Sequence, residues 1–194
     1  MKIAINFGGG DIIHARIDLP LFWAPGDGEL PTSPRDLDLT TTPLARAVAL
    51  NEAWHSRLPL YETGFALNAK VCFAAKYKNV IYAVAIWNHP LARNLPQQEW
   101  LELRRMAIAP DAPKYTGSWM LAGMKRWLQE NARGVTRLIS YHDTAAHKGT
   151  IYKAAGWVES GRRRDHAGWS APSRPRADLQ LAFAEKVRWE IEIG

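Results

Sequence analysis

The sequence LELRRMAIAPDAPKYTGSWMLAGMKRWLQ, residues 101–129, contains a predicted strand, a proline-punctuated loop and a predicted helix in direct succession. The strand is expected over 101–109 and ends at Pro110, because proline lacks the N–H group that a sheet ladder needs. The helix is expected over 118–129, where apolar residues recur with helical spacing. The residues of this apolar stripe are Met120, Met124, Trp127 and Leu128.

The segments on either side continue the succession of helices and strands. They are a helix over 44–54, strands over 70–76 and 80–88, a strand over 136–141, a helix over 149–155, a strand that begins at 157, and a last strand or helix within 178–193. A turn at Lys78 and Asn79 joins the first two strands into an antiparallel hairpin. This order predicts an α/β fold with a mixed sheet.

The length and punctuation of the chain indicate a single domain with an elaborated amino terminus. A chain of 194 residues is long enough to bury one core. Residues 1–45 contain a glycine triplet and five prolines, so we expect an irregular arm or lid that packs on a domain formed by residues 46–194. One cysteine excludes a disulfide framework. Because no segment resembles a signal peptide or spans a bilayer, we expect a soluble cytoplasmic protein.

Positive charge is concentrated in one part of the sequence. The net charge is +6, and residues 104–176 contain 14 Lys and Arg against 5 Asp and Glu. Such a basic region suggests an anionic partner, which would be nucleic acid or a phosphorylated cofactor. Arginines interleaved with an aromatic residue suit phosphate contacts and base stacking, although a solvated basic loop has the same composition. The candidate DNA contacts are Arg162, Arg163, Arg164, Trp169, Arg174 and Arg176.

The start of the helix predicted over 118–129 is a candidate phosphate site. The first backbone N–H groups of a helix have no partner within the helix, and the helix dipole is positive at this end. Phosphates bind at such helix starts, although a plain capped helix is the alternative. The candidate cofactor-binding residues are Arg105, Lys114, Thr116, Gly117 and Ser118.

Polar residues stand where the strand 136–141 ends. Ser140, His142 and Asp143 would lie at the carboxyl edge of the sheet, where open α/β folds bind ligands. Tyr152 follows in the next predicted helix and could donate a proton to a leaving group. Helix capping by Asp143 and core packing by Tyr152 are the structural alternatives. His142, Asp143 and His147 could also bind a divalent metal with one further ligand.

These units together resemble the GNAT superfamily of N-acetyltransferases, in which a strand, a loop and a helix precede a helix with the pattern Tyr-x-x-x-Gly-aromatic, here residues 152–157. That resemblance implies a mixed, mostly antiparallel sheet flanked by helices. Residues 50–176 more narrowly resemble the Mom family of bacteriophage DNA-modification proteins. The motifs are Trp54-His55-Ser56-Arg57, Leu103-Arg104-Arg105-Met106, Ala112-Pro113-Lys114 with Ser118, Ser140-Tyr141-x-Asp143 and Gly149-Thr150-x-Tyr152.

Members of the Mom family attach a carbamoylmethyl group to N6 of adenine in phage DNA, which protects it from host restriction nucleases. The resemblance therefore implies a phage protein that acts on DNA in the bacterial cytoplasm, with acetyl-CoA or another activated acyl or aminoacyl donor. His55 or Asp143 would deprotonate or orient the adenine amine, and Tyr152 would protonate the leaving group. The implied catalytic residues are His55, Ser140, Asp143 and Tyr152, and Ser118 would hold the donor.

Iron is a further cofactor that the resemblance implies, and the candidate ligands are His55, His142, Asp143 and His147. Two other functions remain open on the sequence. One is a conventional acetyl-CoA-dependent N-acetyltransferase that acts on a small amine or a protein, although Pro113–Ser118 replaces the Gln/Arg-x-x-Gly-x-Gly/Ala loop of that superfamily. The other is a non-catalytic DNA-binding protein. The sequence also leaves open whether the protein forms a homodimer.

Overall fold

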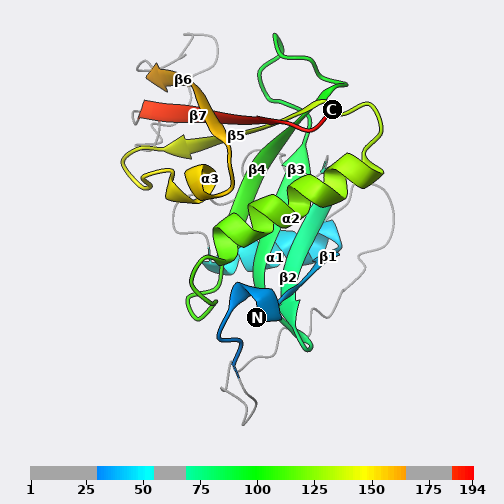
Figure 1. The fold of residues 1–194 in the computed structure, drawn as a ribbon, viewed down its shortest axis with the longest axis vertical. Coiled ribbons are helices and arrows are strands. Elements are labelled where there is room, and N and C mark those ends of the chain that lie inside the picture. Colours follow the sequence, from blue (N-terminus) through cyan, green and yellow to red (C-terminus); the bar gives the residue numbers. More distant parts are fainter. Residues whose placement is uncertain (1–29, 55–68, 165–184) are drawn as a thin grey trace, which may run out of the picture. The chain divides into compact units, whose positions relative to one another are not determined.

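A computed structural model of the chain describes residues 30–54, 69–164 and 185–194 (Figure 1). The predicted α/β class is confirmed, and every helix and strand expected between residues 44 and 164 is present. The elements are η1 (Pro34–Asp36), β1 (Asp38–Thr41), α1 (Leu44–Trp54), β2 (Val71–Tyr77), β3 (Val80–Asn88), β4 (Trp100–Ile108), α2 (Thr116–Asn131), β5 (Arg137–Asp143), α3 (Thr150–Ala154), β6 (Val158–Arg164) and β7 (Glu185–Glu192).

The described strands form one seven-stranded sheet with the order β1-β2-β3-β4-β5-β7-β6. Neighbouring strands are antiparallel except β4 and β5, which are parallel. The sheet is therefore mixed and mostly antiparallel, as expected. It begins with β1, inside the segment for which we expected an irregular arm. Residues 1–29 of that arm lie outside the described residues.

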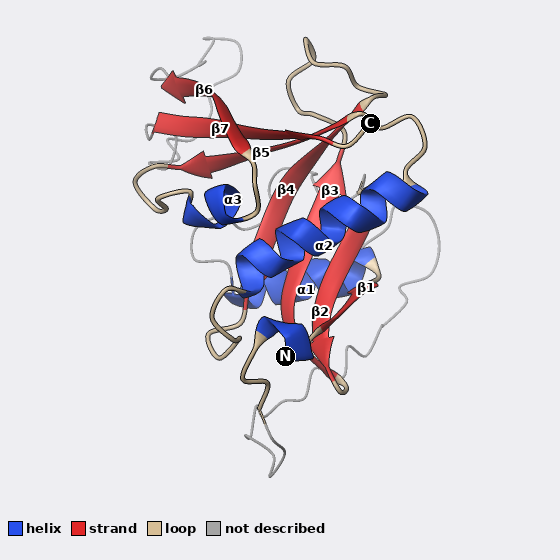
Figure 2. Cartoon of the chain, in the orientation of Figure 1, coloured by secondary structure: helices blue, strands red, loops and turns tan. Residues whose placement is uncertain are grey.

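Helices cover both faces of the sheet, and the alternation of side chains along the strands explains how (Figure 2). On one face, Phe73 and Ala75 pack in a cluster with Met120 and Met124 of α2. On the other face, the intervening residues Cys72 and Ala74 pack against Ala47 of α1. The face that carries α2 and α3 is called the α2 face below, and the opposite face the α1 face. Within the described ranges, no helix is long and apolar enough to cross a membrane.

The two parallel strands separate part-way along their length. β4 and β5 pair from Trp100 with Arg137 to Leu103 with Ser140, but β4 continues to Ile108 and β5 to Asp143. Beyond Leu103 and Ser140 the facing backbone groups of the two strands are not bonded to each other. We call this divergence the fork, and its vertex is the last pair, Leu103 and Ser140. Figure 1 shows the strands diverging on the side where α2 begins.

Candidate functional site

A buried pair of hydroxyl groups lies at the vertex of the fork. The Ser140 Oγ atom is 2.8 Å from the Tyr152 phenol oxygen and 3.4 Å from the Leu103 carbonyl oxygen. Tyr152 extends from α3 and is only 7% exposed. Burial raises the pKa of the Tyr152 phenol, and the hydrogen bond with Ser140 opposes that shift. The phenol therefore keeps its proton at neutral pH, as a proton donor requires.

Aromatic side chains hold Tyr152 in place. The ring of Trp189, on β7, stacks on Tyr152 with 5.4 Å between centroids and an interplanar angle of 9°. Trp157 meets Tyr152 edge-on at 5.7 Å. The Trp189 Nε1–H group donates a hydrogen bond to His142 Nδ1 at 2.7 Å, which fixes the tryptophan ring in turn. Trp189 was not predicted as a site residue, because its segment fitted a strand or a helix and its neighbours come from distant parts of the chain.

Gly149 allows α3 to begin against these rings. Its φ of +69° is in the left-handed region, which favours glycine. A Cβ atom at this position would lie 2.5 Å from Cζ2 of Trp189 and 3.0 Å from Cε1 of His142. Glycine therefore serves two purposes here, the backbone conformation and the close approach of α3 to β7.

The start of α2 combines free helix amides with tight packing. Within the described chain, Tyr115 provides no side-chain cap for the first turn of α2. The hydroxyl of Thr116 donates to Pro113 O, and that of Ser118 donates to Tyr115 O. A Cβ atom on Gly117 would lie 3.1 Å from the Ile151 side chain, so the first turns of α2 and α3 are in contact. The Thr116 N–H donates to Pro113 O at 3.3 Å, so the amides that the first turn can offer to an anion are those of Gly117 and Ser118, and the two hydroxyls face the loop.

The remaining candidates for cofactor binding are placed apart from one another. Lys114 is exposed beside the start of α2. Arg105 pairs with Ile86, a residue of the α1-face cluster, so it lies on the opposite face of the sheet from α2. The structure therefore brings Lys114 near residues 116–118 and leaves Arg105 on the other side of β4.

The proposed metal ligands do not converge. His142 Nδ1 accepts the Trp189 hydrogen bond, and Asp143 Oδ1 accepts the N–H of Ala145 at 2.7 Å. Adjacent residues of a strand point to opposite faces, so His142 and Asp143 diverge. Among the described residues, no three His, Cys, Asp or Glu side chains form a group that could hold a metal ion. The iron site implied by the family resemblance is therefore not supported, and His55 lies outside the described residues.

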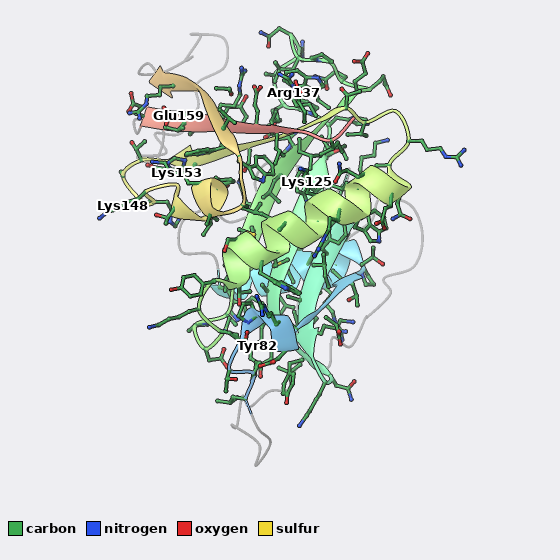
Figure 3. The ribbon with its side chains drawn as sticks, in the orientation of Figure 1. Tyr82, Lys125, Arg137, Lys148, Lys153 and Glu159 are labelled. Atoms are coloured by element: carbon green, nitrogen blue, oxygen red, sulfur yellow. The ribbon has the colours of Figure 1, made fainter. Side chains whose placement is uncertain are left out.

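A basic cleft is present on the α2 face between α3 and strands β5, β7 and β6. It encloses about 180 Å³. Figure 3 shows Lys148, Lys153 and Glu159 at this end of the sheet. Arg162 also lines the cleft, and it forms ion pairs with Glu159 at 2.6 Å and Glu185 at 3.5 Å. The described lining residues with basic or imidazole side chains are His142, His147, Lys148, Lys153 and Arg162.

The expected DNA contacts fall partly in β6 and partly outside the described residues. Arg162 is exposed, and its charge is offset by its two carboxylate partners. Arg163 and Arg164 occupy the last two positions of β6. Trp169, Arg174 and Arg176 lie outside the described residues.

A family model described as the Mom protein family matches residues 75–171, half of the chain. The chain belongs to the Mom protein family. The segment that matches the Mom model includes both members of the Ser140–Tyr152 pair, the start of α2 and both strands of the fork. No curated protein matches the sequence significantly.

Solved structures of acetyltransferases resemble the fold. The ribosomal-protein-S18-alanine N-acetyltransferase of Escherichia coli aligns with a TM-score of 0.59 and 18% identity over 81% of this chain and 94% of that one. A Bacillus subtilis acetyltransferase in complex with CoA aligns with a TM-score of 0.58 and 11% identity over 80% of this chain and 98% of that one. An N-acetyltransferase of Staphylococcus aureus aligns with a TM-score of 0.58 and 9% identity over 81% of this chain and 97% of that one. These likenesses confirm the predicted GNAT-like fold of this Mom family member.

Proposed function

We propose that the protein is a DNA-modifying transferase that moves a group from an acyl-CoA donor to the N6 amine of adenine, and that the modified DNA resists restriction nucleases. The observation that carries this proposal is the buried Ser140–Tyr152 pair at the vertex of the fork, inside the segment that matches the Mom family. A protonated phenol at that point suits the release of a thiolate.

The fork suits an extended donor that contains amide groups. Between residues 104–108 of β4 and 141–143 of β5, the facing backbone groups do not pair with each other. The pantetheine arm of CoA is extended and carries amides, so it can bond to these strand edges as another strand would. The start of α2 offers the backbone N–H groups of Gly117 and Ser118 and a positive dipole end to the pyrophosphate. A structural neighbour with a related fold is described in complex with CoA, which fits this placement.

The proposed reaction balances as an acyl transfer. The adenine amine attacks the thioester carbonyl carbon, a C–N bond forms and the C–S bond breaks. Tyr152 gives its proton to the leaving sulfur, and the proton lost by the amine returns to the phenolate. One thioester and one amine thus become one amide and one thiol. The family's carbamoylmethyl product instead has a methylene carbon on N6, so it requires a donor activated at that carbon, and the product mass distinguishes the two.

Nucleoside mass spectrometry tests the proposal in cells. The protein is expressed in a bacterium beside a plasmid, and the plasmid DNA is digested to nucleosides. We expect a heavier deoxyadenosine, with a gain equal to a carbamoylmethyl or an acyl group. The Tyr152→Phe variant should give little of it, whereas Tyr77→Phe, which changes a tyrosine at the far end of β2, should match the wild type. Unmodified DNA in cells that contain folded wild-type protein would contradict the proposal.

A conventional acetyl-CoA-dependent N-acetyltransferase is the second candidate, because the fold likeness to N-acetyltransferases covers most of the chain. It differs in its acceptor, which would be a small amine or a protein. Release of free CoA from acetyl-CoA in the presence of a panel of amines, with no increase on addition of DNA, would favour this second function.

A further inference from the structure

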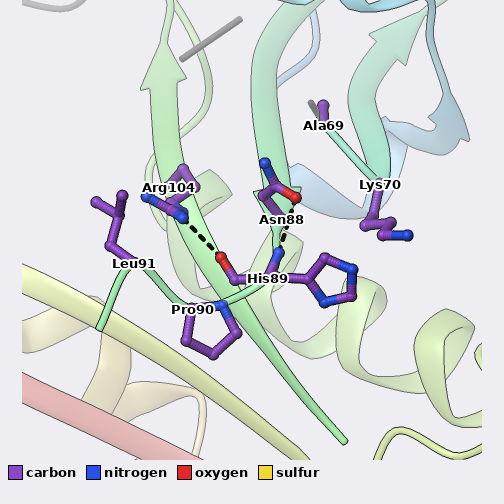
Figure 4. Close-up of a pocket in the computed structure, with 7 residues that line it drawn as sticks. All are labelled: Ala69, Lys70, Asn88, His89, Pro90, Leu91 and Arg104. Carbon is purple, nitrogen blue, oxygen red and sulfur yellow. Dashed lines mark hydrogen bonds between the residues drawn. The ribbon is translucent and has the colours of Figure 1, made fainter. Parts of the chain in front are cut away.

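A second, larger cleft lies at the end of β3, where the chain leaves the sheet (Figure 4). It encloses about 500 Å³, within the usual range for ligand sites. Lys70, just before β2, borders it on one side. His89 and Arg104 border it from the end of β3 and from β4. We call this the β3 cleft.

The lining of the β3 cleft is positively charged. Lys70 and Arg104 are cations, and no described carboxylate is among the lining residues. The Nδ1 atom of His89 is buried and has no hydrogen-bond partner within the described part of the chain. Arg104 already has Glu102 as a counter-ion, so Lys70 supplies the net positive charge, which together with the imidazole favours an anionic ligand.

Arg104 is held rigidly in this lining. Its side chain is 6% exposed, its Nη2 donates to the His89 carbonyl oxygen at 2.6 Å, and its Nε is 3.4 Å from Glu102 Oε1. The other oxygen of Glu102 accepts the Leu91 N–H at 2.9 Å, so the same carboxylate fixes the turn after β3. Burial raises the pKa of Glu102, and this outweighs the lowering by the Leu91 N–H, Arg104 and Arg105. The guanidinium group of Arg104 is therefore fixed in position without a ligand.

The β3 cleft is next to the vertex of the fork but on the other face of the sheet. Leu103, the last residue of β4 that pairs with β5, packs in the same core cluster as Tyr152. Arg104 follows directly and faces Glu102, which pairs with Asn88 on the α1 face. A donor in the fork and a ligand in the β3 cleft would thus approach β4 at adjacent residues from opposite faces.

We propose that the β3 cleft binds a backbone phosphate of the acceptor DNA strand. This inference rests on the proposed function, because it assigns the DNA side of the same site. A phosphodiester supplies an anion for Lys70 beside the Arg104–Glu102 pair, and the volume of the cleft also admits the attached sugar. Phosphate contacts fix the register of a nucleic acid without reading its sequence, so this contact would position a strand whose adenine enters the fork.

Salt-dependent DNA binding tests the inference. Fluorescence anisotropy measures the affinity of the full chain for a labelled duplex at a series of salt concentrations, with wild type, Lys70→Gln and Lys70→Glu. Both variants should bind more weakly, and Lys70→Gln should flatten the slope of log affinity against log salt by about 0.9, the value for one lost phosphate contact. Lys78→Gln is the matched control, because Lys78 is exposed at the opposite end of the β2–β3 hairpin.

The outcomes separate the inference from the proposed function. If the wild type binds DNA and both Lys70 variants keep its affinity and salt slope, the inference is wrong and the function stands. If CoA affinity falls in Lys70→Gln while DNA affinity does not, the cleft serves the donor's phosphates and the inference is again overturned. If the folded wild type does not bind DNA, the proposed function fails and the inference fails with it.

Discussion

Replacement of Gly149 by alanine should lower the stability of the fold and disturb the packing of the candidate site. At φ +69° a residue with a Cβ atom pays about 1–2 kcal/mol in backbone strain. The added Cβ would also lie 2.5 Å from Trp189 and 3.0 Å from His142, and overpacking of this kind costs about 1–3 kcal/mol. The free energy of unfolding should therefore fall by about 2–5 kcal/mol, which lowers the Tm by roughly 4–20 °C in a chain of this size.

Gly134→Ala separates the two contributions. Gly134 has a φ of +83°, but a Cβ atom there would have no described atom within 4 Å. This control should lose only the backbone part, about 1–2 kcal/mol, and should keep wild-type DNA modification. Gly149→Ala should lose more stability in urea unfolding, and modification should fall because Trp189 moves against Tyr152. Equal losses of stability in the two variants would refute the close approach of α3 to β7.

The further predictions concern four single side chains. Tyr152→Phe should slow DNA modification by about 10²–10⁴-fold while the protein still folds, since a general acid contributes that much; wild-type activity in this variant would count against the proton-donor role. Burial raises the pKa of the Cys72 thiol from 9.0 to about 11, so a thiol reagent should label it only after unfolding. The pKa of Cys72 is higher in the folded protein than in the unfolded chain, so the contribution of this thiol to stability is present below pH 9 and is lost as pH rises through about 11. Urea unfolding at several pH values can measure this loss. Burial, and to a smaller extent His147, lower the pKa of the His142 imidazole in the folded protein. The contribution of His142 to stability is therefore present above the unfolded pKa of about 6.5 and is lost as pH falls through the lower folded pKa. Trp189→Phe removes the donor to His142 Nδ1 and should cost about 1–3 kcal/mol of stability, measured in the same assay.

Local signals in the sequence were enough to place most of the elements. The helix expected over 44–54 matches α1 residue for residue, because apolar spacing along a helix depends on near neighbours. The hairpin of β2 and β3 was equally clear, and its turn at Lys78 has a positive φ of 54°. β1 was missed, because four residues between prolines carry too little pattern to indicate a strand.

Features that depend on pairing between distant segments could not be read from the sequence. The fork exists because β4 and β5 stop pairing after Leu103 and Ser140, and no local pattern encodes that register. β7 lies between β5 and β6, so the last strand of the chain places Trp189 against Tyr152. Ser140 and Tyr152 were each recognised as candidates, but their contact follows only from the packing of α3 on the sheet. The Arg104–Glu102 pair behind the β3 cleft is likewise a product of tertiary structure.

The central claim is that a group passes from a CoA thioester to adenine N6 at the Ser140–Tyr152 pair. The most direct measurement is made on one reaction of purified protein, plasmid DNA and acyl-CoA thioesters, in which free CoA thiol and modified deoxyadenosine are both quantified. We predict that the two products form in equal amounts, depend on DNA, and fall together in Tyr152→Phe. Modified adenine without release of CoA, or CoA release that is the same with and without DNA, would contradict this account.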